Sequence, residues 1–196
     1  MSHRVLLAVL AGCLLSFTAF SRTTNVSRAR PGNWAVAISR PGLPNCFQLT
    51  TNFYRGAQPT AAGMRTLKEM GVKTVVNLRS FHSDRELVSD TGLNRRHLKL
   101  EPWHLDDEQA VQFLKLVGDT NNLPIFIHCQ RGADRTGTLC ALYRIAVCGW
   151  PKAEAIEEMR EGGFGFSPAW QNLVKYLEEA DIDRLRQKAG LAAMAK

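Results

Sequence analysis

The sequence predicts a single-domain α/β fold in which a parallel-rich central sheet is flanked by helices. The chain has 196 residues, of which 45% are hydrophobic, and this length and composition suit one core of ordinary size. Short runs rich in β-branched and aromatic residues alternate along the chain with helical patterns, as in proteins built from parallel strands and crossover helices. No internal repeat or long low-complexity tract interrupts this alternation.

The predicted strands are the runs 52–55, 73–78, 95–100 and 123–127. Helical patterns are present between and after them, at 60–70, 84–91, 107–117, 136–148, 152–161 and 168–187. Pro151 and Pro168 suit first-turn positions of the last two helices, and Ser167 is a suitable N-cap. In open α/β sheets, ligands bind beyond the carboxyl ends of the strands, so the loops at 79–83, 101–105 and 128–135 are expected to border a site.

The first 21 residues resemble a targeting segment. Arg4 precedes an almost wholly apolar run, Val5 to Phe20, which is short for a membrane span and long for a minimal signal peptide. Leu10-Ala11-Gly12-Cys13 resembles a lipoprotein box with Cys13 as the lipidated residue, and Ala19-Phe20-Ser21 resembles a cleavage site. A signal peptide, a lipoprotein signal and an uncleaved signal anchor therefore stay open. We expect location in the cell envelope, with membrane attachment through the N-terminus as one option and the cytoplasm as the alternative.

The remaining chain divides into a linker or an irregular entry to the domain at 22–44, the folded domain at 45–187 and a C-terminal tail at 188–196. The net charge is +7, but all 18 acidic residues lie after residue 40, and residues 41–196 carry only +2. This modest excess suits an anionic substrate and does not indicate a nucleic-acid surface. We expect a monomer with no nucleic-acid partner.

The run His128–Gly137 joins the strand-like segment 123–127 to the helical pattern at 136–148. In such a strand-loop-helix crossover, the loop amides at the helix N-terminus have no helical partners, and together with the helix dipole they form an anion site. The segment therefore predicts a loop that binds one phosphate group.

Within this loop, Cys129, Gly132 and Arg135 supply the chemistry. A thiol at a helix N-terminus beside a cation has a lowered pKa, and its thiolate is a nucleophile. Arg135 offers a planar fork to two phosphate oxygens, and Gly132 permits the tight turn. Of the five cysteines, only Cys129 has an arginine six residues later. The alternative is an inert cysteine buried at a strand end.

The segment resembles the signature loop of cysteine-dependent protein tyrosine and dual-specificity phosphatases, His-Cys-(x)5-Arg-(Thr or Ser). Phe53–Pro59 and Gly71–Arg79 resemble the opening of compact bacterial dual-specificity-like phosphatases, and the resemblance spans roughly residues 45 to 180. It implies hydrolysis of phosphate monoesters, on a phosphorylated protein or a small molecule, through a phosphocysteine intermediate. A phosphate-binding module without turnover and a sulfurtransferase or arsenate reductase are the alternatives.

By this resemblance Cys129 attacks phosphorus, Arg135 and the loop amides hold the phosphate oxygens, and Thr136 hydrogen-bonds the sulfur. The loop residues expected to bind substrate are Gln130, Arg131, Gly132, Ala133 and Thr136.

The proton donor for the leaving group is harder to assign, because the family's usual aspartate, about thirty residues before the cysteine, is missing. Asp106 and Asp107 lie 23 and 22 residues before Cys129, but Asp106 is also the expected N-cap of the helix at 107–117. Asp134 is the favoured candidate, since myotubularin-like enzymes resemble this chain in placing an aspartate directly before the loop arginine. An ion pair with Arg131 is its alternative role.

Several other residues are given secondary roles. His128 is expected to brace the loop, and Arg55 is either structural or pocket-lining. Cys46, Cys140 and Cys148 are candidates for a protective disulfide with the thiolate, if the chain is exported. No paired His or Cys spacing indicates a metal site, so we expect no metal and no other cofactor. The residues that follow two strands and are candidates to border the pocket are Arg79, His82, Arg85, Glu101, Trp103 and His104.

Overall fold

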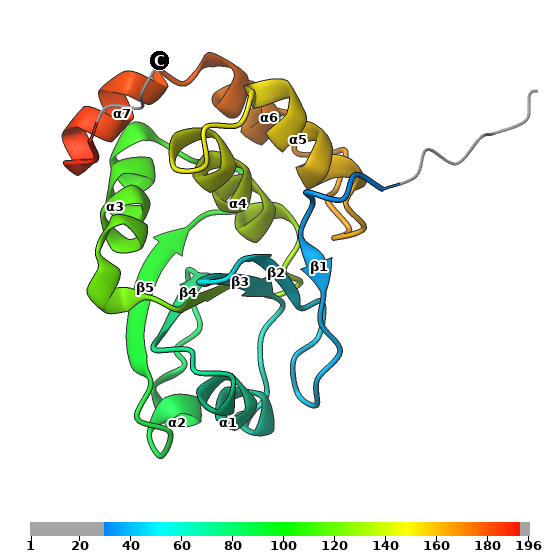
Figure 1. The fold of residues 1–196 in the computed structure, drawn as a ribbon, viewed down its shortest axis with the longest axis vertical. Helices are drawn as coiled ribbons and strands as arrows, with labels where there is room; N and C mark the ends of the chain where they lie inside the picture. The colour runs from blue at the N-terminus through cyan, green and yellow to red at the C-terminus, as the bar shows by residue number, and fades with distance from the viewer. Residues whose placement is uncertain (1–29, 193–196) are drawn as a thin grey trace, which may run out of the picture.

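The structure is a computed structural model that describes residues 30–192. A mixed six-stranded sheet lies between two layers of helices (Figure 1). Its strands are β1 (Val36–Ala37), β2 (Phe47–Thr50), β3 (Phe53–Gly56), β4 (Thr74–Arg79), β5 (Asn94–Leu100) and β6 (Ile125–His128). Their order across the sheet is β1-β2-β3-β6-β4-β5.

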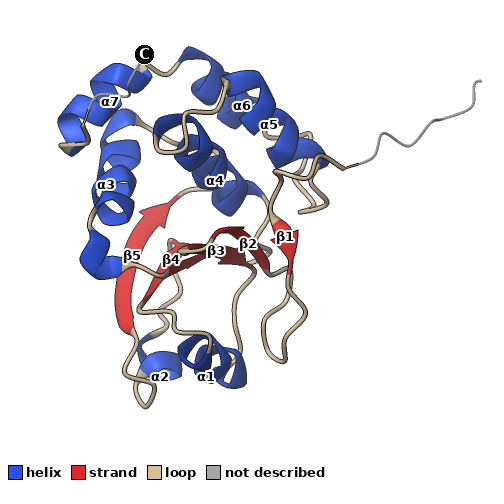
Figure 2. Cartoon of the chain, in the orientation of Figure 1, coloured by secondary structure: helices blue, strands red, loops and turns tan. Residues whose placement is uncertain are grey.

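The helices divide unequally between the two faces of the sheet (Figure 2). One face is covered by α1 (Ala61–Glu69) and the one-turn α2 (Arg85–Val88). The other is covered by α3 (Asp107–Gly118), α4 (Asp134–Ala146), α5 (Lys152–Glu161), α6 (Gln171–Glu179) and α7 (Ile182–Ala189). A short 3-10 helix, Thr120–Asn122, leads into β6.

The four strands predicted from sequence form the parallel part of the sheet, as expected. Strand β6 pairs in parallel with β3 on one side and β4 on the other, so that His128 lies in register with Gly56 and Asn77. All four residues of β6 are fully buried, because parallel strands between two helical layers have no solvent-facing side. The carboxyl ends of β3, β4 and β6 therefore lie close together.

Two apolar clusters hold the layers together. The smaller one joins α1 to the sheet through Met64, Leu67, Val75 and Phe126. The larger one lies on the opposite face and includes Phe53, Phe113 and Ile127. At about 25 cal/mol per Å² of apolar surface removed from water, such burial is the main stabilising contribution to the fold.

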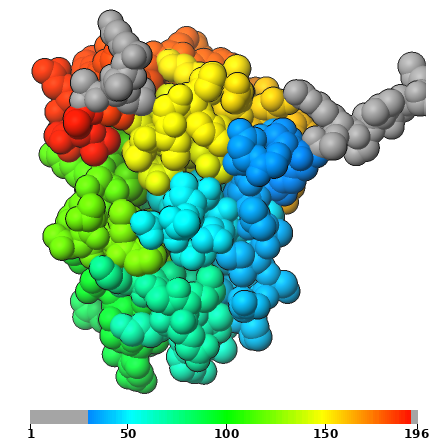
Figure 3. All heavy atoms as spheres, in the orientation of Figure 1, coloured from blue at the N-terminus to red at the C-terminus, as the bar shows by residue number. Residues whose placement is uncertain are grey.

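Residues 22–44 were predicted to be a linker or an irregular entry to the domain, and the described part, residues 30–44, packs against the domain. Trp34 and Ala35 are buried, and the Arg144 guanidinium donates to the carbonyl of Asn33 at 3.3 Å. The amide of Ala35 donates to Glu158 at 2.5 Å. Figure 3 shows this blue segment packed against the rest of the molecule. The packed domain therefore begins before residue 45, because this segment provides β1 and core side chains.

The two antiparallel strands β1 and β2 were not predicted, and they make the sheet mixed rather than wholly parallel. The predicted helix at 168–187 is also two helices. It starts at Gln171 and breaks at Ala180 and Asp181, where the Asp181 carboxylate accepts a hydrogen bond from the amide of Arg184 at 3.0 Å. A side chain that caps a new helix satisfies amides that a continuous helix would have bonded internally.

The predicted leader, with Cys13, lies outside the described residues. Within residues 30–192, none of the helices combines the length and the apolar character needed to cross a bilayer.

Candidate active site

The predicted phosphate-binding loop joins the end of β6 to the start of α4. His128 is the last residue of β6, Cys129 follows it, and α4 begins at Asp134, two residues earlier than the sequence predicted. Cys129 is 3% exposed and Ala133 is also buried, whereas Gln130 is exposed. The first amides of α4 therefore lie beside the thiol, and amides in a first helical turn have no acceptor within the helix.

Gly132 is required in this loop for two reasons. Its φ of +68° is a left-handed conformation that side chains with a Cβ rarely adopt. A Cβ on Gly132 would also lie 2.4 Å from the carbonyl carbon of Gly56 and 2.5 Å from the nitrogen of Ala57. The loop thus rests directly on the backbone that follows β3, and the Gln58 amide donates to the carbonyl of Gln130 at 3.2 Å.

The pKa of the Cys129 thiol lies below its ordinary value. Burial acts to raise this pKa, but hydrogen bonds from the hydroxyl and amide of Thr136, the charge of Arg135 and the amide of Gly132 outweigh it. The Thr136 hydroxyl is buried and has no nitrogen or oxygen partner in the described part of the chain. The same groups that the sequence assigned to the anion site therefore favour the thiolate form of this sulfur.

Arg135 is anchored by backbone carbonyls at the ends of two neighbouring strands. Its Nη1 donates to the carbonyl of Leu100 at 3.3 Å and lies 3.5 Å from that of Leu78. These residues belong to β5 and β4, and the arginine side chain remains partly exposed. The guanidinium is thus held beside the thiol at the carboxyl edge of the sheet.

His128 braces the loop, as expected, and its partner is Asp84, a residue that the sequence did not single out. The Nε2 atom of His128 lies 2.7 Å from Asp84 Oδ2, and the side-chain amide of Gln58 donates from Nε2 to Asp84 Oδ1 at 2.9 Å. Burial acts to raise the Asp84 pKa, but the hydrogen bond and the charge interaction with His128 lower it below its ordinary value. Nothing in the local sequence Ser83-Asp84-Arg85 distinguishes this carboxylate from an ordinary surface one.

Asp134 lies at the first position of α4, beside the loop, and both of its carboxylate oxygens are occupied. One accepts a hydrogen bond from Arg131 at 2.8 Å, and the other accepts from the amide of Ser167 at 2.8 Å. Arg131 itself is largely exposed. The alternative role for Asp134, an ion pair with Arg131, is therefore present in the structure, and its function as an acid stays a prediction.

Asp106 and Asp107 both have structural roles. Asp106 forms a capping box with Gln109, in which each side chain bonds the other residue's backbone amide. Asp107 accepts hydrogen bonds from the hydroxyl of Tyr176, at 3.2 Å, and from Arg184. These contacts tie α3 to α6 and α7.

A pocket of about 290 Å³ lies in front of the loop. It brings together Gln130 and Arg135 with four of the six border candidates, while Arg85 and His104 are not among its lining. Phe81, which the sequence did not nominate, lines it too. Its full lining is Arg79, Ser80, Phe81, His82, Glu101, Pro102, Trp103, Gln130 and Arg135.

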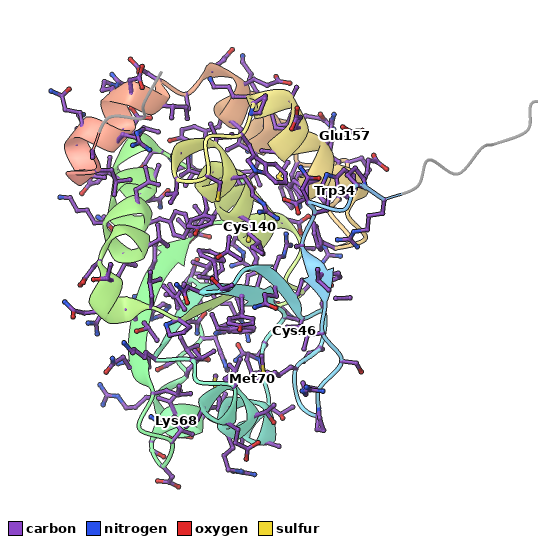
Figure 4. All side chains as sticks on the ribbon, viewed as in Figure 1. Trp34, Cys46, Lys68, Met70, Cys140 and Glu157 are labelled. Carbon is purple, nitrogen blue, oxygen red and sulfur yellow. The ribbon has the colours of Figure 1, made fainter. Side chains whose placement is uncertain are left out.

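The other cysteines are free thiols in the described residues. Burial raises the pKa of Cys46 to about 11 and that of Cys140 to about 12. The two lie in different core clusters on opposite sides of the sheet (Figure 4). A protective disulfide with Cys129 stays a prediction. In residues 30–192, no group of three or more His, Cys, Asp or Glu side chains is arranged to hold a metal ion.

Comparison with known proteins shows the family to which the chain belongs. The family model described as "DSP-PTPase phosphatase fused to NAD+ Kinase" matches residues 45–169, nearly two thirds of the chain. The chain belongs to the dual-specificity phosphatase family. Its relative TpbA from Pseudomonas aeruginosa, a dual specificity protein phosphatase, is 32% identical over 184 residues, covering 93% of this chain and 83% of TpbA.

Solved structures agree with this family assignment. The crystal structure of P. aeruginosa TpbA in complex with phosphotyrosine is similar to this phosphatase with a TM-score of 0.73, covering 83% of this chain and 99% of that one. The catalytic core of SIW14 from Saccharomyces cerevisiae, a PP-IP phosphatase, shares the fold at a TM-score of 0.68 and 23% identity, covering 78% and 94% of the two chains. In Arabidopsis thaliana, the inositol diphosphatase DSP5 is 24% identical over 155 residues, covering 74% of this chain and 73% of DSP5.

The protein is a cysteine-dependent phosphatase that hydrolyses phosphate monoesters. This assignment selects the phosphatase interpretation over a phosphate-binding module, a sulfurtransferase and an arsenate reductase. The loop geometry agrees with it, because the Cys129 sulfur, Arg135 and the amides of a helix N-terminus lie together beside a pocket that Gln130 and Arg135 line.

Proposed function

We propose that this phosphatase prefers aryl phosphates, with phosphotyrosine in proteins as its substrate class. The observation that carries the proposal is a pair of exposed aromatic side chains at the pocket: Phe81 is 96% exposed and Trp103 is 60% exposed, and both line the pocket that contains Arg135. Aromatic rings in contact contribute about 0.5–1.5 kcal/mol beyond the area that they bury. A phenyl leaving group between the two side chains would gain this contribution, and a serine leaving group would not.

In the proposed reaction, the Cys129 thiolate attacks phosphorus while the bond from phosphorus to the ester oxygen breaks. Arg135 and the loop amides bind the three other phosphate oxygens as charge accumulates on them. The leaving oxygen takes a proton from a general acid. Water then attacks the phosphocysteine, inorganic phosphate leaves, and the sulfur departs as a thiolate that accepts the hydrogen bond of Thr136.

Glu101 is the proposed general acid. It follows Leu100, whose carbonyl accepts hydrogen bonds from Arg135 and from the Ser80 hydroxyl at 2.9 Å, so its backbone is tied to the phosphate clamp. It is the one acidic residue that lines this pocket among the described residues. Its carboxylate makes no ion pair or hydrogen bond within residues 30–192, so no partner must be displaced before it protonates a leaving group.

Asp134 is the second candidate for the same role. Its position before Arg135 supports it, but both oxygens accept hydrogen bonds, and protonation would disrupt the ion pair with Arg131. The dependence of the rate on the leaving group separates the two candidates, as described in the Discussion.

The experiment is a comparison of substrates with the wild-type chain and four variants, without added metal. Turnover of para-nitrophenyl phosphate is expected, and Cys129→Ser is expected to abolish it. Phe81→Ala and Trp103→Ala are expected to lower kcat/KM for a phosphotyrosine peptide roughly three- to tenfold and to leave phosphoserine turnover nearly unchanged. The matched control is Val36→Ala, which removes an exposed apolar side chain from β1. Equal losses on both peptides would exclude the aromatic preference.

A second candidate substrate class is a compound with another phosphate beside the scissile one. Arg79 and His82 line the same pocket as Arg135, and the Nε2 of His82 lies 3.8 Å from Asp84 Oδ1, beyond hydrogen-bond distance. The names of two relatives support this substrate class, because DSP5 is an inositol diphosphatase and SIW14 is a PP-IP phosphatase. Arg79→Gln is expected to lower kcat/KM for a diphosphorylated substrate more than for a monophosphate. Equal effects on the two substrates would exclude the class.

We also propose that the chain is exported to the cell envelope. The support is the basic and apolar leader over residues 1–21. Fractionation of cells that express the full chain is expected to place it outside the cytoplasm, and Cys13→Ala is expected to release it from membranes if Cys13 is lipidated. Recovery of the full-length chain in the cytosol would contradict export.

A further inference from the structure

Arg55 has a guanidinium that lies wholly inside the protein, directly behind the phosphate-binding loop. It is the third residue of β3 and is only 1% exposed. Its Nη2 donates a hydrogen bond of 2.6 Å to the carbonyl of Gly132, the residue at the tightest point of the loop. The guanidinium carbon also lies 3.8 Å from the centroid of the Phe164 ring. The side chain therefore supports the loop from the interior and does not line the pocket.

The charge of Arg55 has no carboxylate partner in the described residues. The nearby buried carboxylate, Glu158, is engaged by Arg144 through hydrogen bonds of 2.8 and 2.9 Å. The Nε atom of Arg55 lacks a hydrogen-bond partner altogether within the described chain. Burying a cation without a counter-ion costs several kcal/mol, so the surroundings of Arg55 must supply a negative charge.

The thiolate of Cys129 is the group that meets this need. Burial lowers the pKa of Arg55, whereas the charge interactions with Cys140 and Cys129 raise it. Cys140 remains a neutral thiol at neutral pH, because burial raises its pKa to about 12. Cys129 is the cysteine of this pair whose pKa is lowered, by hydrogen bonds from Thr136 and the charge of Arg135.

We infer that Arg55 is a positioning residue that fixes the phosphate-binding loop at Gly132 and balances the charge of the Cys129 thiolate from inside the protein. The inference rests on Cys129 as the nucleophile. It adds to Arg135 a second cation, which comes from β3 and bonds the phosphate-binding loop from the interior at Gly132.

The other charged groups around this pair are accounted for. From α4, Arg135 and the hydroxyl of Thr136 act on the thiolate directly. Arg144 of α4 and Glu158 of α5 act on Arg55 with opposite signs and are bonded to each other, so their effects largely cancel. A change of charge at residue 55 is therefore expected to appear in the ionisation of Cys129.

The test compares Arg55→Gln, which removes the charge and keeps a hydrogen-bond donor, with Arg55→Lys, which keeps the charge. The readout is the pH dependence of alkylation of Cys129 by iodoacetamide, followed by mass mapping of the Cys129 peptide. Since a nearby cation favours the ionised thiol, Arg55→Gln is expected to move the alkylation midpoint of Cys129 to higher pH. Arg55→Lys is expected to keep the alkylation midpoint of Cys129 near that of the wild type. If Arg55 had only a structural role, the charge at residue 55 would not determine this midpoint.

Equal midpoints in the Gln and Lys variants would overturn the inference. If Arg55→Gln does not fold, the same substitution is made in the Cys129→Ser background, where the proposed counter-charge is absent. In the Cys129→Ser background, Arg55→Gln is expected to leave the Tm unchanged or raise it. If Arg55→Gln prevents folding in this background as it does in the wild-type background, the inference is overturned. Alkylation needs no turnover, so this result is independent of whether the proposed substrate is correct.

Discussion

The imidazole of His128 and the carboxylate of Asp84 lie 2.7 Å apart, and neither side chain is exposed to solvent. The contact joins the end of β6 to the residue that precedes α2, 44 positions earlier in the chain. Gln58 binds the second oxygen of the same carboxylate and also accepts a hydrogen bond of 3.0 Å from Arg79. The backbone that leads into Cys129 is therefore held by a buried polar network.

Asp84→Asn is expected to weaken this network. A hydrogen bond to a charged group contributes about 1.5–3 kcal/mol, so we expect a loss of about 2 kcal/mol in the free energy of unfolding by urea at pH 7. Because the Asp84 pKa is lowered in the folded state, its contribution is fully present above the unfolded pKa of about 3.9 and is lost as the pH falls through the folded pKa. The difference between wild type and variant should therefore shrink below about pH 4. A difference that is constant with pH would contradict this account.

Gly132→Ala is expected to abolish catalysis, because the added Cβ would overlap the backbone of Gly56 and Ala57. Gly71→Ala is the matched control: its φ of +82° imposes similar backbone strain, but no atom lies within 4 Å of the added Cβ. The control should lose about 1 kcal/mol of stability and keep its kcat. The assay is turnover of para-nitrophenyl phosphate together with circular dichroism. Normal activity in Gly132→Ala would show that the loop does not need this close approach.

Thr136→Val removes the hydroxyl that donates to the Cys129 sulfur and keeps the shape of the side chain. Since that hydrogen bond lowers the thiol pKa, its loss should move the alkylation midpoint of Cys129 to higher pH. The departure of the thiolate from phosphocysteine should slow roughly tenfold or more, the equivalent of a hydrogen bond to a charged group. Rapid-quench kinetics should then show a burst of released phenol. Thr136→Ser keeps the hydroxyl and should resemble the wild type; a similar burst in both variants would argue against the hydroxyl's role.

Glu101→Gln is expected to lower kcat about a hundredfold on phenyl phosphate, whose phenolate is a poor leaving group. The loss on para-nitrophenyl phosphate is expected to be much smaller. A positioned acid raises the rate about 10²–10⁴-fold when the leaving oxygen needs a proton. Asp134→Asn should lower both rates by a similar factor, since it disturbs the contacts with Arg131 and Ser167. The reverse pattern would assign the acid to Asp134. Asp106→Asn and Asp107→Asn serve as controls, because they alter the N-terminus of α3 and its contacts with α6 and α7, and neither residue lines the pocket.

Much of the fold was predictable because strand-like runs and helical patterns alternate along the chain, as in proteins built from parallel strands and crossover helices. The four predicted strands are β3, β4, β5 and β6, and the helices between them lie close to their expected positions. Strands β1 and β2 were missed because β1 has only two residues and β2 only four, too few to give a clear periodic pattern. The helix break at Ala180 was missed because apolar residues recur on both sides of it.

The site was predictable where its residues are contiguous. The segment from Cys129 to Thr136 carries the predicted nucleophile, the predicted phosphate-binding arginine and the tight turn, and the structure places them together. Asp84 and Phe81 come from a distant loop, and no sequence spacing relates them to the cysteine. Arg55 was left open between two roles because a single arginine before a turn gives no indication of burial. Such contributions depend on tertiary packing, which one sequence does not reveal.

The clamp arginine reaches its position through carbonyl groups of the main chain at Leu78 and Leu100. Every amino acid supplies a carbonyl, so this support is indifferent to the side chains present at those two positions and at the loops that follow them. Substitutions in these loops can therefore change the shape and polarity of the pocket while the arginine stays in place. Substrate choice can therefore change through these loops while the position of Arg135 is kept.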